Sequence, residues 1–143
     1  MILDIRHTGI VVANLDEALY FWCEVLGFVV IKEMEESGPY IDAMMGLTDA
    51  KVSTFKLRAP DGGMIELLHF LSHPDKTKWA GKPYSTGITH IAMSVSNLYD
   101  VSKKIQIAGG VFFAPPQLSP DGAVKVAYCQ GPEGILLELV EVL

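Results

Sequence analysis

Four residues in this chain have side chains that commonly bind metals and stand where such side chains are unusual. His7 and His90 lie in apolar segments with strand character, and Glu66 and Glu138 interrupt two other apolar runs. A carboxylate buried without a partner is strongly unfavourable, so each glutamate should lie on an exposed sheet face, be protonated or bind a cation. Two imidazoles and two carboxylates suit a borderline to hard divalent ion such as Zn, Ni, Co, Mn or Fe.

The same four residues occupy equivalent positions of an internal repeat. Residues 7–15 align with 90–98 at an offset of 83, and residues 60–67 align with 132–139 at an offset of 72. Packing of the two copies about a pseudo-twofold axis would bring both histidines and both glutamates together. The sequence therefore predicts one divalent ion per chain, bound by His7, Glu66, His90 and Glu138, with coordination positions left for water or substrate oxygens.

Each residue taken alone has a simpler explanation. A histidine in a strand is more often a structural or surface residue than a ligand, and a glutamate on the open face of an antiparallel strand needs no metal. The recurrence of both residue types at matched positions of the repeat favours the metal site.

The elements that must position these residues follow one order in both copies: strand, helix and further strands. Helical spacing runs from Leu15 to Leu26, after an Asn14 cap, and recurs more weakly after Asn97. Segments of strand length and composition cover 51–57, 64–71, 124–128 and 135–142. We therefore expect an α+β fold of two βαβββ modules within a single domain, 1–143. Module 1 covers about 1–72, a linker about 73–86 and module 2 about 87–143.

The two offsets differ by 11 residues, which places an insertion between Val30 and Asp49 of the first module. Its apolar side chains, including Tyr40 and Met44, suit an adaptable wall of a binding pocket. We expect Tyr40 and Met44 to bind substrate, the alternative being a plain surface insertion.

Composition excludes several classes of partner. The formal charge is −6 and no dense Lys/Arg cluster occurs, so neither nucleic acid nor a membrane surface is expected to bind. The N-terminus lacks the apolar stretch of a signal peptide, and no run of eighteen apolar residues occurs. A cytoplasmic protein is expected.

The motifs resemble those of the vicinal oxygen chelate superfamily, also called the glyoxalase, bleomycin resistance and dioxygenase superfamily. The stretch 16–22 followed by Val25-Leu26-Gly27-Phe28 is similar to the helix of that family, and 132–138 to its closing motif. The resemblance implies two βαβββ modules forming a curved mixed sheet around a metal cleft, with ligands from the first and last strands of each module. His7, Glu66, His90 and Glu138 match those positions.

The ligand pattern is most similar to glyoxalase I and methylmalonyl-CoA epimerase. The resemblance thus implies a metal-dependent lyase or isomerase that moves a proton α to a carbonyl through a metal-bound enediolate, with Glu138 and Glu66 as candidate bases. It also implies a small-molecule substrate with adjacent oxygens, and a homodimer. An extradiol-type dioxygenase and a small-molecule-binding resistance protein remain alternatives. The substrate, the metal and the number of chains that supply the ligands stay open.

Overall fold

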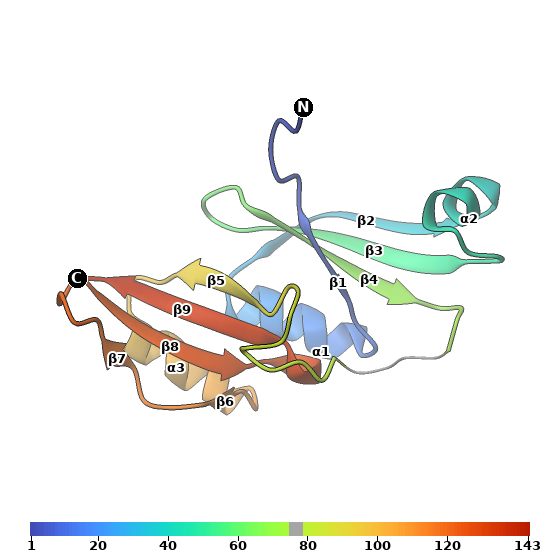
Figure 1. Ribbon diagram of the computed structural model, residues 1–143. Helices are drawn as coiled ribbons and strands as arrows, with labels where there is room; N and C mark the ends of the chain where they lie inside the picture. The colour runs from blue at the N-terminus through green and yellow to red at the C-terminus, as the bar shows by residue number, and fades with distance from the viewer. Residues whose placement is uncertain (75–78) are drawn as a thin grey trace. The chain divides into compact units, whose positions relative to one another are not determined.

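The protein, described by a computed structural model over residues 1–74 and 79–143, divides into two compact units, Met1–Thr77 and Lys78–Leu143. Each unit contains one mixed β-sheet and few helices (Figure 1). In both units a strand is followed by a helix and then by further strands. This arrangement confirms the α+β class and the order of elements expected from the repeat.

The sheet of the first unit has the strand order β1-β4-β3-β2. Its strands are β1 (Thr8–Val11), β2 (Val29–Ser37), β3 (Lys51–Arg58) and β4 (Met64–Phe70). β1 runs parallel to β4, whereas β4, β3 and β2 are joined in antiparallel pairs. The first and last strands of the module are therefore direct neighbours.

The first helix begins as an α-helix, α1 (Leu15–Leu19), and continues as the π-helical segment η1 (Tyr20–Val25). The Asn14 side chain accepts a hydrogen bond from the Glu17 backbone N–H at 3.1 Å, as its expected role at the N-cap requires. Phe21 and Trp22 are buried, and Trp22 packs edge-on against Phe28. The predicted helix is thus confirmed in extent, while its second half has wider turns than expected.

The insertion in the first module folds into a helix, α2 (Pro39–Met45). It ends at Gly46, whose φ of 66° is left-handed and favours glycine. Ile41 packs with Ala50 and Val52 in a buried cluster. The Asp42 carboxylate accepts hydrogen bonds from the backbone N–H groups of residues 49 and 50. These bonds hold the helix against the segment that leads into β3.

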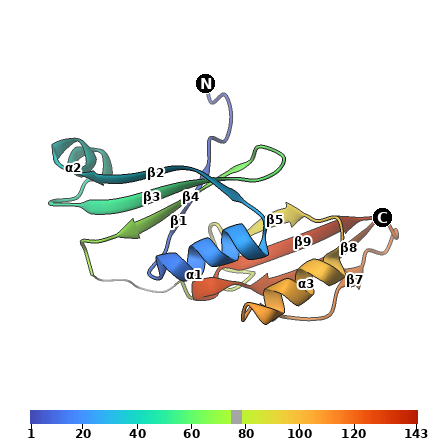
Figure 2. The ribbon, with the colours of Figure 1, turned by 180° about the vertical axis from the view of Figure 1, so that it is seen from behind.

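The second unit repeats the parallel pairing of its first and last strands. Its sheet contains β5 (His90–Ser94), β6 (Val111–Phe112), β7 (Gln117–Leu118), β8 (Val124–Gln130) and β9 (Leu136–Val142). The order is β5-β9-β8-β6, with β7 also paired to β8 and a short 3₁₀ turn, η2 (Pro132–Gly134), between β8 and β9. The helix α3 (Leu98–Ile107) packs on this sheet (Figure 2) and is capped by Asn97. Among the helices described, none is long and apolar enough to cross a membrane.

Candidate metal centre

Strand register brings a histidine and a glutamate to the same face of each sheet. In the first unit Gly9 pairs with Glu66, and in the second Ala92 pairs with Glu138. Each histidine stands two residues before the paired small residue, and residues two apart in a strand point to the same face. The two modules therefore use one backbone geometry to place their pairs. His90 is the first residue of β5, and His7 immediately precedes β1.

The two side chains of each pair are in contact. His7 Nε2 lies 2.8 Å from Glu66 Oε2, and His90 Nε2 lies 3.1 Å from Glu138 Oε2. Two ligand atoms about 2.1 Å from a metal and separated by a right angle at the metal, as in octahedral coordination, would lie about 3 Å apart, and both pairs have this spacing. Neither unit, over the residues described, adds a third His, Cys, Asp or Glu to its pair. Each unit therefore presents one imidazole nitrogen and one carboxylate oxygen that could serve as metal ligands.

The pair of the second unit is held by neighbouring side chains. The Tyr128 hydroxyl donates a hydrogen bond to Glu138 Oε2 at 2.9 Å and lies 3.2 Å from His90 Nε2. Thr89 Oγ1 lies 2.8 Å from His90 Nδ1, and a bond from Nδ1–H to this oxygen leaves the Nε2 lone pair for a metal. Burial, followed by the hydrogen bond and negative charge of Glu138, raises the pKa of Tyr128, which therefore remains a donor at neutral pH.

The pair of the first unit has a different neighbour. Lys56 pairs with Glu66 between β3 and β4, as Tyr128 pairs with Glu138 between β8 and β9. The two positions are related by the same offset of 72 residues as the glutamates. Sequence reasoning missed both Tyr128 and Lys56, although extending the second alignment into the preceding strand would have found them.

The structure places Tyr40 and Met44 on α2, with exposed fractions of 74% and 56%. The helix packs through Ile41 toward Val52 and Leu68. Leu68 lies two residues after Glu66 in β4, so α2 covers the end of the face that carries Glu66. The insertion is a helix on the face of the predicted ligands, and its two predicted substrate-binding side chains extend into solvent.

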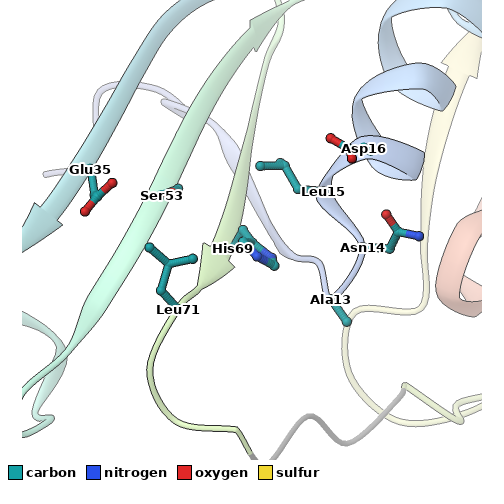
Figure 3. Close-up of a pocket in the computed structure, with 8 residues that line it drawn as sticks. All are labelled: Ala13, Asn14, Leu15, Asp16, Glu35, Ser53, His69 and Leu71. Carbon is teal, nitrogen blue, oxygen red and sulfur yellow. The ribbon is translucent and has the colours of Figure 1, made fainter.

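An open pocket of about 700 Å³ lies on the opposite face of the first sheet, between the start of α1 and strands β2 to β4 (Figure 3). Glu35, Ser53 and His69 line it from the sheet, and their register places them opposite the face of Glu66. His69 Nδ1 also lies 3.1 Å from the Val12 carbonyl oxygen, a contact with the backbone of the neighbouring strand. His69 therefore lies outside the predicted centre.

The chain thus belongs to the class of proteins built from two βαβββ modules. In each module the first and last strands are neighbours and present one histidine and one glutamate. A family model described as the Glyoxalase/Bleomycin resistance protein/Dioxygenase superfamily matches residues 4–139, and the chain belongs to this superfamily. The resemblance inferred from the sequence is confirmed.

Curated relatives and solved structures agree with this assignment. The chain is 28% identical over 138 residues to a probable lactoylglutathione lyase of Synechocystis, covering 94% of this chain and 92% of that protein. It is 25% identical over 138 residues to a lactoylglutathione lyase of Neisseria meningitidis, covering 94% and 88%. A glyoxalase family protein from Bacillus cereus has the same fold, with a TM-score of 0.90 over 100% of this chain and 96% of that chain at 24% identity.

Proposed function

We propose that the protein is a metal-dependent lyase or isomerase of the glyoxalase I or epimerase type, which removes and returns a proton at a carbon next to a carbonyl. The observation that carries the proposal is the pair of matched contacts, His7 with Glu66 and His90 with Glu138, at 2.8 and 3.1 Å. Two such half-sets supply the two nitrogens and two oxygens of one divalent centre.

The donor set fits Zn, Ni, Co, Mn or Fe, and a divalent ion held there would polarise a substrate carbonyl and offset the charge that develops on its oxygen. The protein must also supply a base within reach of the reacting carbon. Glu66 and Glu138 are our candidates, because each carboxylate lies beside the expected position of the substrate oxygens. Tyr128 orients Glu138 through its hydrogen bond at 2.9 Å and so restricts where that carboxylate can act.

The insertion is the proposed determinant of substrate choice. Helix α2 covers the end of the face that carries Glu66, and its exposed Tyr40 and Met44 offer an aromatic and a flexible apolar contact. Replacing Tyr40 and Met44 with alanine should change substrate preference and leave the metal content unchanged. Unaltered affinity and selectivity would remove α2 from the site.

The reaction can be tested by proton exchange in heavy water. A panel of thiohemiacetals, including that of glutathione, 2-methyl-branched acyl-CoAs and α-hydroxycarbonyl compounds is incubated with metal-loaded protein, and NMR follows exchange at the α-carbon. Metal-dependent exchange that is lost in Glu138→Gln or Glu66→Gln supports the proposal. Consumption of oxygen with a catechol and Fe(II), without exchange in any panel member, would instead indicate a dioxygenase.

We further propose a homodimer, by analogy with the family, which sedimentation at micromolar concentration can test. Mixing two inactive variants then identifies the chains that supply the ligands. One variant carries His7→Ala and Glu66→Gln, and the other carries His90→Ala and Glu138→Gln. Recovery of metal binding after mixing means that each site combines two chains, whereas no recovery means that one chain supplies all four ligands.

A further inference from the structure

A row of charged side chains crosses the first sheet beside the His7–Glu66 pair. Glu66 pairs with Lys56 on β3, and Lys56 pairs with Lys32 on β2. Directly paired residues point to the same face, so the row runs from Glu66 toward the edge strand. Arg58, two residues beyond Lys56 in β3, places a third cation on this face.

The two lysines are arranged in a way that is unfavourable without a counter-ion. Like charges directly opposite on neighbouring strands destabilise a sheet. Over residues 1–74 and 79–143, neither lysine forms an ion pair with a carboxylate. Glu66 contacts His7 instead, and Glu36, which shares this face, accepts a hydrogen bond from Thr54 at 3.2 Å. The positive charge of Lys56 and Lys32 is therefore not neutralised by a direct contact.

The second module shows that a lysine is not required to support the pair. Tyr128 occupies the position equivalent to Lys56 and supports Glu138 with a neutral hydroxyl. Two glutamates already match the charge of a divalent ion, so Lys56 and Lys32 would leave an excess positive charge beside the centre. This excess occurs in a chain whose formal charge is −6.

We propose that Lys56, with Lys32 beside it, binds an anionic group, a carboxylate or a phosphate, on the substrate. The inference rests on the proposed function, because it assumes that the substrate's adjacent oxygens lie at the ligands of the metal centre. A lysine ammonium carries three donors on a flexible stem and can reach either anion. The competing explanation is that Lys56 only balances the charge of Glu66 within the sheet.

Three compounds with the same α-hydroxyketone isolate the effect of charge. Dihydroxyacetone is neutral, dihydroxyacetone phosphate carries a phosphate, and 5-hydroxy-4-oxopentanoate carries a carboxylate. Calorimetric titration of the zinc-loaded full-length chain should show at least one charged compound binding about tenfold more tightly than dihydroxyacetone, equivalent to about 1.4 kcal/mol. Preference for the phosphate or for the carboxylate identifies the anion, and rising salt should reduce the preference.

Lys56→Met should abolish this preference without weakening the binding of dihydroxyacetone. The matched control is Lys51→Met, which makes the same change in the same strand on the opposite face of the sheet. A second measurement needs no variant. Acetylation of Lys56 by sulfosuccinimidyl acetate, followed by peptide mass spectrometry, should be slowed by the preferred charged compound and not by dihydroxyacetone, whereas Lys51 should react equally in both.

The outcomes separate this inference from the proposed function. Zinc uptake at about one ion per chain, with equal binding of neutral and charged compounds or no protection of Lys56, overturns the anion site alone. An equal preference in Lys56→Met and Lys51→Met also overturns it. Failure to take up zinc contradicts the proposed function and, with it, the anion site.

Discussion

The two modules place their histidine and glutamate with the same strand register and then surround them with different side chains. Glu138 faces Tyr128, which donates to it at 2.9 Å, whereas Glu66 faces Lys56, with no ion pair between them. The backbone repeat therefore places the two pairs alike, whereas the residue on the neighbouring strand differs: a neutral hydroxyl lies beside Glu138 and a lysine beside Glu66. We propose from this difference that the second module orients its pair through Tyr128, whereas the first module supplies positive charge through Lys56.

The largest effect expected from this comparison concerns the sheets themselves. Leu67 and Leu139 occupy equivalent positions of the repeat, and both have an exposed fraction of 0%. Leu67→Ala or Leu139→Ala should each lower the free energy of unfolding by about 2–5 kcal/mol, because a cavity replaces buried contacts. Urea titration can measure both variants.

Exposed leucines provide matched controls for these two variants. Leu71→Ala in the first unit and Leu118→Ala in the second should each change the free energy of unfolding by less than about 0.5 kcal/mol. If a core variant is destabilised no more than its control, the leucine of that module is not packed as its counterpart is, which would contradict the equivalence of the two halves.

An intermediate effect is expected at the residues that distinguish the modules. Tyr128→Phe should weaken zinc binding by about 10–100-fold, because it removes a hydrogen bond that orients a ligand. Lys56→Met should leave zinc affinity unchanged or slightly higher, since it removes a positive charge near the ion. Competition with a chromophoric chelator can measure both, with Tyr99→Phe on the exposed side of α3 as the control. Equal losses in the two variants would contradict the division of roles.

The smallest expected effect concerns the helix caps, where the modules are most alike. Asn14 accepts from the N–H of Glu17 at 3.1 Å, and Asn97 accepts from the N–H of Asp100 at 3.0 Å. Asn14→Ala or Asn97→Ala should each cost about 1 kcal/mol in thermal or urea unfolding. The corresponding Asn→Asp variants keep an acceptor and should retain most of the stability. Alanine variants as stable as the parent would mean that these bonds do not contribute.

The fold could be predicted from the sequence because the repeat aligns the predicted strands of one module with those of the other, and the helix N-cap residues likewise. The sequence did not predict the π-helical turns of Tyr20–Val25, since the apolar spacing of the first helix is compatible with either kind of turn over so short a stretch. No secondary structure was predicted for the insertion, because Pro39 to Met45 is too short for helical periodicity to be clear.

The sequence singles out individual residues for the proposed site but not the side chains that surround them. Alternation within a strand predicts which neighbours share a sheet face with His7 or with Glu66. The contact between these two residues depends in addition on the parallel register that pairs Gly9 with Glu66. Register between distant segments is set by tertiary packing and is not visible in either segment alone. The alignment matches Lys56 with Tyr128, but their places beside Glu66 and Glu138 became apparent only when the strands were paired.

The most direct test of the central proposal, one metal centre that needs both pairs, is metal stoichiometry in variants that lack one pair. Metal-free protein is dialysed against zinc, and bound metal is counted by elemental analysis in the parent, in His7→Ala/Glu66→Gln and in His90→Ala/Glu138→Gln. We predict about one ion per chain in the parent and little tightly bound metal in either variant, because two ligands hold an ion poorly. Two ions in the parent with one retained in each variant, or no ion in the parent, would contradict the account.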